Sequence, residues 1–190
     1  MNHVETLIRN SADYWRGRME RPSLHEVVLN HGRAMEVQRL TISEARRVAH
    51  MVARGFENSR ACKPKQCYMN AQTLIGEYHM RTERHALGGS GNVQYCEGYA
   101  AEDGGPMLIG HAWITINAKV VDVTLRANGR WALRANGKWT RRTHSYFGVE
   151  VPYALLIENQ QKTRCYCPVI EGPFKENLFP DVYSTLQERL

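Results

Sequence analysis

The spacing of the apolar residues changes near residue 93, and this change restricts the folds that the chain can adopt. Before residue 93, apolar residues recur every three or four positions, as in amphipathic helices. After it, short apolar runs are separated by Asn-Gly and Gly-Gly pairs, which favour turns between strands. Helices followed by short strands predict an α+β protein. We expect an N-terminal helical lobe packed on a mostly antiparallel β-sheet.

The helical part has clear start signals. The predicted helices cover residues 4–15, 23–32, 41–56 and 66–80. Thr41 and Glu44 have the spacing of a capping box, in which each side chain bonds to the backbone N–H of the other residue. The apolar stripe that we expect to be buried on this third helix contains Ile42, Ala45, Val48, Ala49, Val52 and Phe56. The fourth helix is predicted to begin at or near Cys67.

The second part of the chain is predicted to be mostly strands. The candidate strands are residues 93–100, 110–116, 119–125, 130–133, 151–158 and 162–170, with a short helix in the tail 179–190. The chain of 190 residues has a length that suits one domain. We expect a single domain over 1–190, with the helical lobe at 1–60, a core at 61–170 and a basic hairpin inserted at 125–142.

That hairpin accounts for the charge of the chain. The sequence "LRANGRWA" is followed at once by "LRANGKWT", and each copy holds an Asn-Gly pair suited to a tight turn. The segment has six basic residues and no acidic one, which equals the net charge of +6. These residues are Arg126, Arg130, Arg134, Lys138, Arg141 and Arg142. The hairpin is either a solvated surface element or a binding site for nucleic acid or an acidic protein partner.

Composition suggests a compartment. No apolar run approaches the roughly 18 residues that span a bilayer, and polar residues interrupt the N-terminus where a signal peptide would be apolar. We therefore expect a cytoplasmic protein that does not bind membranes. In that compartment the five cysteines are expected to be mostly reduced thiols.

Three residues have the types and order of a thiol active site. A helix N-terminus favours a thiolate, and we expect Cys67 to lie there. His111 begins one predicted strand and Asp122 lies in the next, 11 positions later. If these strands form a hairpin through Asn117-Ala118, the imidazole can approach the carboxylate. A thiol, an imidazole and an orienting carboxylate are the groups of a nucleophilic triad. Each residue alone is more typical of a structural role.

The motifs that carry these residues resemble those of the transglutaminase-like superfamily of papain-type cysteine enzymes. They are Cys67 in "KQCYMNA", His111 in "GHAW" and Asp122 in "VVDVT", and the likeness covers residues 60–157. Val123 stands where the family pattern has proline. The chain is also similar to small stand-alone proteins of this type encoded by bacteria and their phages, for which the host cytoplasm is the expected location. The same order of residues is reminiscent of arylamine acetyltransferases, which match less well in context and length.

The resemblance implies a peptidase, amidase or deamidase, or an acyltransferase, that acts on a peptide or protein amide through a thioester. Cys67 would be the nucleophile, His111 the general base and acid, and Asp122 the orienting carboxylate. The Gln66 side chain is a candidate oxyanion donor, and Glu97 and Tyr99 are candidates for lining a substrate groove, with Trp113 packed beside the histidine. The alternative is a non-catalytic module that binds through the basic hairpin.

No cofactor is implied by this chemistry, and we expect no metal site. Cys165 and Cys167 form a Cys-x-Cys pair whose side chains would share one face of a predicted strand. With Cys62 or a histidine they could ligate zinc. No second pair with zinc-ligand spacing accompanies them.

Overall fold

A computed structural model of the chain describes residues 2–19, 22–56, 66–84, 92–127, 131–133, 139–141, 144–172 and 178–179. Its helices are α1 (His3–Trp15), α2 (Leu24–His31), α3 (Ile42–Gly55), α4 (Cys67–Arg84), α5 (Val123–Ala127) and α6 (Tyr153–Thr163). Its strands are β1 (Arg33–Met35), β2 (Val93–Glu102), β3 (Ile109–Ile116), β4 (Lys119–Val121), β5 (Trp131–Leu133), β6 (Trp139–Arg141) and β7 (His144–Val151). The α+β class is confirmed.

Local signals determine where the first helices begin. Thr41 and Glu44 form the predicted capping box at the start of α3, and Ser23 and Glu26 form one at the start of α2 that was not predicted. On α1, Val4, Ile8 and Ala12 are buried. No helix in the described ranges is both long and apolar enough to cross a bilayer.

The predicted stripe of α3 is buried only in part. Its later residues Val48, Val52 and Phe56 are half-buried and pack against the main core, whereas Ile42, Ala45 and Ala49 are exposed. Glu44 and Met51, which were not in the predicted stripe, are buried. The Glu44 carboxylate accepts hydrogen bonds from Lys119 Nζ at 2.9 Å and from Asn117 Nδ2 at 2.9 Å. These charged and polar partners, together with the packing of the later apolar residues, orient α3.

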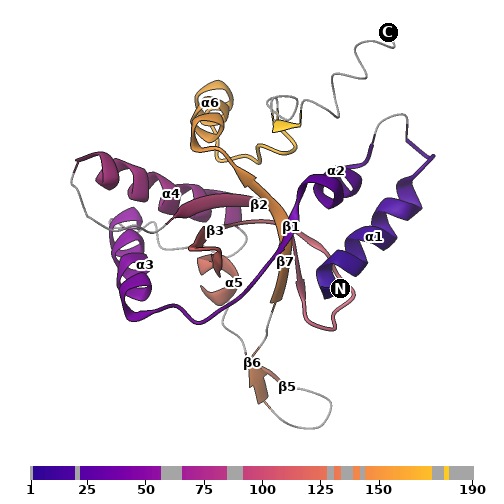
Figure 1. Ribbon diagram of the computed structural model, residues 1–190, viewed down its shortest axis with the longest axis horizontal. Helices are drawn as coiled ribbons and strands as arrows, with labels where there is room; N and C mark the ends of the chain where they lie inside the picture. The colour runs from indigo at the N-terminus through magenta and orange to yellow at the C-terminus, as the bar shows by residue number, and fades with distance from the viewer. Residues whose placement is uncertain are drawn as a thin grey trace.

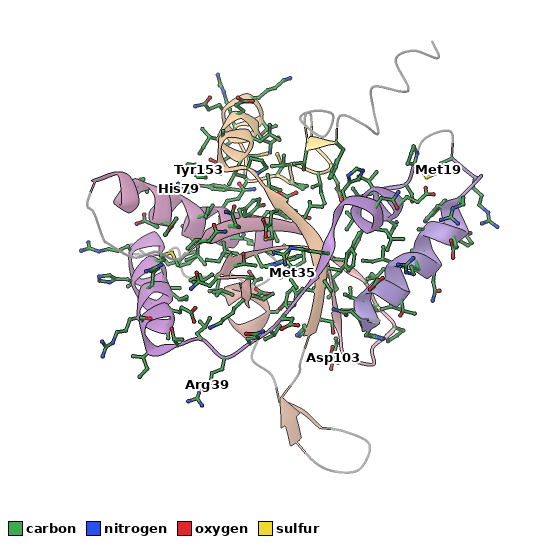
Figure 2. All side chains as sticks on the ribbon, in the orientation of Figure 1. Met19, Met35, Arg39, His79, Asp103 and Tyr153 are labelled. Carbon is green, nitrogen blue, oxygen red and sulfur yellow. The ribbon has the colours of Figure 1, made fainter. Side chains whose placement is uncertain are left out.

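One antiparallel sheet of five strands, in the order β1-β7-β2-β3-β4, forms the centre of the molecule (Figure 1). In this view α1 and α2 lie to the right of the sheet, and α3 and α4 lie to the left. The two edges of the sheet also meet, because Val120 N donates to Glu36 O at 2.9 Å beside a parallel bridge between Glu36 and Lys119. The sheet is therefore curled.

The curl encloses a small second core. It contains Met35, Cys96, Ala100, Trp113, Val120 and Tyr146. A Cβ on Gly148 would stand 2.7 Å from the Trp113 ring and 2.3 Å from the carbonyl oxygen of Glu97. Glycine at this position thus lets the indole lie across the sheet. The main core on the opposite face packs α1, α2, α4 and α6 against the sheet.

Several predicted elements differ from the structure. Residues 153–163 form α6 rather than a strand, and 164–167 are not in a strand either. The strands β1 and β7 were not predicted, and β1 lies within the segment that we expected to be entirely helical. The segment 119–125 splits into β4 and α5, with Asp122 between them. The repeat does form a hairpin, β5–β6, that projects from the body of the molecule (Figure 1).

The turn between β3 and β4 gives a first prediction. Asn117 and Ala118 both have positive φ angles, 50° and 63°, as a type I′ turn requires. Alanine is strained in this region, whereas glycine is not. We expect Ala118→Gly to raise the free energy of unfolding by about 1 kcal/mol, measured by urea denaturation. The matched change Ala53→Gly, at an exposed position inside α3, should lower it by about the same amount. A loss of stability in Ala118→Gly would contradict this account of the turn.

Candidate functional site

Cys67 is the first residue of α4, and its thiol is buried beside β3. The N–H groups of the first helical turn have no partner within the helix, and they give that end a partial positive charge. Burial raises the pKa of Cys67. The hydrogen bond and charge of His111, with backbone N–H groups of Ala112 and Tyr68, outweigh burial and bring the pKa below its usual value. The surroundings of the sulfur therefore favour the thiolate.

His111 connects the thiol to a carboxylate. Its Nε2 lies 2.6 Å from Asp122 Oδ2, and the side chain is 2% exposed. Because Nε2 bonds to Asp122, Nδ1 is the ring nitrogen left for the hydrogen bond with Cys67. Burial lowers the pKa of His111, but its bonds to Asp122 and Cys67 and their charges raise that pKa to about 9. The imidazole therefore favours the charged form at neutral pH.

Asp122 is held by four hydrogen bonds. Its Oδ1 accepts from the backbone N–H groups of Thr124 at 2.8 Å and Leu125 at 3.1 Å, so the carboxylate caps α5. Its Oδ2 accepts from His111 and from the Tyr146 hydroxyl at 2.8 Å. Burial raises the pKa of Asp122, and the bonds and charge of its partners lower it below the usual value. The carboxylate is thus fixed and ionised.

Two connections place the triad. The β3–β4 hairpin pairs Ile114 with Val121, which brings the residue after β4 back toward His111. Asn70 lies one helical turn after Cys67, and its Nδ2 donates to Thr124 Oγ1 at 2.8 Å. This bond ties the first turn of α4 to the first turn of α5. The thiol and the carboxylate are therefore positioned on two helix starts, with the imidazole of β3 between them.

The second core supports the imidazole. The Trp113 ring lies beside that of His111, with centroids 6.1 Å apart and planes at 19°. Trp113 is 1% exposed, and its Nε1 donates to Met35 Sδ at 3.3 Å. Tyr146 packs edge-on against Trp113 while its hydroxyl bonds to Asp122. Trp113 thus contacts the triad from inside the curled sheet, where a substrate has no access.

Glu97 is also inside the protein. It is fully buried, and its carboxylate accepts from the Tyr95 hydroxyl at 2.7 Å and from the backbone N–H groups of Val169 at 2.9 Å and Ile170 at 3.0 Å. These bonds hold the segment after α6 against β2. The structure therefore places Glu97 as a support of this segment rather than as the lining of a groove. Of the other candidates, Gln66 is exposed next to Cys67, and Tyr99 is 7% exposed.

The basic residues are described only in part. The structure describes the backbone of Arg126, which lies in α5, and that of Arg141, which lies in β6. Arg130, Arg134, Lys138 and Arg142 lie outside the described residues, as does Cys62. The hairpin itself has a defined register, with Trp131 opposite Arg141 and Leu133 opposite Trp139. The backbone of the repeat is therefore a two-stranded ribbon separate from the main sheet.

The remaining thiols are not joined by disulfides in the described part of the chain. The side chains of Cys165 and Cys167 are joined by a hydrogen bond, and Cys167 Sγ also donates a hydrogen bond to Thr163 Oγ1 at 3.2 Å. No group of three or more His, Cys, Asp or Glu side chains within the described ranges could hold a metal ion.

Sequence reasoning missed the residues that complete the site. Tyr146 lies 24 residues after Asp122, in a strand that was not predicted. The alternation of the apolar residues Phe147, Val149 and Val151 with Gly148 and Glu150 in "HSYFGVEV" was a signal for that strand. Asn70 and Thr124 had no recognisable signal, because their bond joins two helices 54 residues apart.

The buried Glu97 gives a prediction on pH. Burial is the largest influence on this carboxyl group and raises its pKa from 4.5 to about 7, although the N–H groups of Ile170 and Val169 and the Tyr95 hydroxyl lower it. A carboxyl with a raised folded pKa stabilises the fold below its unfolded pKa, and this contribution is lost as pH rises through 7. We expect the free energy of unfolding of the wild type to fall by roughly 3 kcal/mol between pH 4.5 and pH 7, relative to that of Glu97→Gln.

Urea denaturation of both proteins across this range of pH measures that difference. The comparison with Glu97→Gln removes the contributions of all other groups, and Glu158→Gln, at an exposed position on α6, is the control that should follow the wild type. Parallel curves for the wild type and Glu97→Gln would contradict the assignment.

Comparison with known proteins adds no family: no protein-family model, curated protein or solved structure matches the chain. The functional argument therefore depends on the geometry of Cys67, His111 and Asp122.

Proposed function

We propose that this protein is a cysteine-dependent enzyme that cleaves or transfers amide bonds, as the resemblance to transglutaminase-like enzymes implies. The observation that carries the proposal is the continuous chain of hydrogen bonds from the Cys67 thiol through His111 to Asp122. All three groups are buried, and the pKa of the thiol is lowered while that of the imidazole is raised. A thiolate-imidazolium pair at a helix start is the form in which cysteine acts as a nucleophile.

In the proposed reaction the Cys67 thiolate attacks the carbonyl carbon of an amide, forming a C–S bond and an oxyanion. Backbone N–H groups at the start of α4, and the side-chain amide of the adjacent Gln66, would stabilise this charge. The His111 imidazolium gives its proton to the leaving nitrogen, the C–N bond breaks and a thioester remains. His111 then takes a proton from water as the water attacks the thioester carbon, the C–S bond breaks, and the carboxylic acid leaves as the thiolate-imidazolium pair is restored. In a transferase an amine replaces the water.

The proposal is tested with p-nitrophenyl acetate, which acylates activated nucleophiles without requiring a specific binding site. We expect a rapid release of nitrophenolate, and mass spectrometry should find one acetyl group on the Cys67 peptide that hydroxylamine removes. Cys67→Ala should abolish both signals, and Cys165→Ala, which removes an exposed thiol, should leave them unchanged. Acetylation that is equal in wild type and Cys67→Ala would overturn the proposal.

A second candidate function is favoured by the β5–β6 hairpin, which forms a sheet of its own within the segment 125–142, whose six basic residues equal the net charge of the chain. We propose that it binds an anionic partner such as single-stranded nucleic acid. Affinity for an oligonucleotide should then fall steeply with added salt, because binding releases counterions. Binding that is absent at low salt would exclude this function, and the result is independent of Cys67.

A further inference from the structure

Aromatic side chains lie on the α4 side of the sheet, next to Cys67. Tyr68 follows Cys67 on α4, and its hydroxyl lies 3.9 Å from the point where a Cβ on Gly110 would stand. Gly110 precedes His111 and is paired with Tyr99 across β2 and β3. The Tyr99 ring is stacked on that of His25, with centroids 4.9 Å apart and planes at 9°. Tyr68, Tyr99 and His25 thus form an aromatic wall beside exposed Gly110 and the buried triad.

A carboxylate stands close to this wall. The Glu97 carboxylate accepts hydrogen bonds from the backbone N–H groups of Val169 and Ile170, which fixes this part of the chain. Glu171 is the next residue, and its side chain is exposed. Burial is the main cause that raises the pKa values of Tyr68 and Tyr99, and the charge of Glu171 raises both further. Its charge therefore acts on both phenols. Within the described ranges Glu171 has no hydrogen bond or ion pair.

We infer that Tyr68 and Glu171, backed by the buried Tyr99, form a subsite that binds a cationic group of the substrate, next to the amide that Cys67 attacks. This inference rests on the proposed function. A carboxylate attracts an ammonium or guanidinium group, and the face of the half-buried Tyr68 ring attracts the same cations. A substrate with a carboxylate in that position would be repelled by Glu171. The cation is either the side chain of a lysine or arginine or a free N-terminal amine, because the chemistry of recognition is the same.

Charged thiol reagents test the subsite without a known substrate. Two methanethiosulfonates of similar size modify Cys67, one with a trimethylammonium group and one with a sulfonate, and peptide mass spectrometry gives the rate at Cys67 for each. We expect Glu171→Gln to lower the ratio of the cationic to the anionic rate by roughly fivefold, as for one unit charge several ångströms away near a protein surface. Glu171→Lys should lower the ratio further. Glu158→Gln, which removes an exposed charge on α6, should leave it unchanged.

The two proposals fail in different ways. A ratio that is the same in wild type and Glu171→Gln, with Cys67 reacting rapidly in both, overturns the subsite and leaves the enzyme proposal intact. Slow reaction of Cys67 with both reagents in the wild type overturns the enzyme proposal, whatever the ratio. High salt should reduce the difference between the variants, because it screens the charge of Glu171.

Three chloroacetamide probes of equal length identify the source of the cation. One presents a lysine side chain with a blocked N-terminus, the second presents norleucine with a free N-terminus, and the third presents norleucine with a blocked N-terminus. We expect the lysine or the free-amine probe to label Cys67 faster than the third probe, and Glu171→Gln to remove this advantage. Equal rates for all three probes in the wild type would overturn the subsite.

Discussion

Replacing Asp122 by asparagine is expected to lower the rate at which Cys67 is acylated by a factor on the order of 10²–10⁴. The asparagine amide would direct N–H donors toward His111 Nε2, which now bonds to a carboxylate oxygen at 2.6 Å. Nε2 would then have to accept a hydrogen bond, so the proton of the neutral ring would move to Nδ1. That nitrogen faces Cys67 and could no longer take the proton of the thiol.

The measurement is the burst of nitrophenolate from p-nitrophenyl acetate over a range of concentrations. Asp13→Asn is the matched control, because Asp13 is exposed and is paired with Arg16, the residue that follows α1. It should react like the wild type. Since the carboxylate also caps α5, a thermal unfolding curve of Asp122→Asn checks that the variant is folded. A folded Asp122→Asn variant that is acylated at the wild-type rate would contradict the role given to Asp122.

Replacing Trp113 by alanine is expected to lower the free energy of unfolding by about 3–5 kcal/mol, the range for removal of a large buried ring. The indole is 1% exposed inside the curled sheet and packs against both Tyr146 and His111. The strand opposite the ring cannot fill the space that it leaves, because Gly148, where a Cβ would stand 2.7 Å from the indole, has no side chain. Trp113→Phe should recover part of the loss.

Urea denaturation at constant pH measures the change, with Trp15→Ala as the control. Trp15 is 41% exposed at the end of α1, so its removal should cost about 1 kcal/mol or less. A loss of the same size in both variants would mean that Trp113 is not the centre of a second core.

The parts of the fold that could be predicted depend on contacts between residues close in sequence. The predicted capping box of α3 joins residues three positions apart, and the Asn117-Ala118 turn joins two adjacent strands. These features identified the helices and the hairpin that carries His111. The helix start at Cys67 could be predicted for the same reason.

Elements determined by distant partners could not be predicted. The sequence "VPYALLIE" is apolar without a clear period, and it forms α6 with only Leu156 and Asn159 fully buried. Asp122 was expected within a strand, but its bonds to Thr124 and Leu125 make it a helix cap. Tyr146 binds Asp122 from a strand whose place between β1 and β2 depends on the whole sheet.

The pH dependence of alkylation at Cys67 by iodoacetamide tests the central claim most directly, with wild type and His111→Ala compared by peptide mass spectrometry. The claim is that Cys67 is an ion-paired thiolate whose pKa is lowered by His111. It predicts rapid labelling well below the pKa of an ordinary thiol, and a shift of the profile to higher pH in His111→Ala. Labelling of Cys67 that is no faster than that of Cys96 and Cys167, and unchanged in His111→Ala, would contradict it.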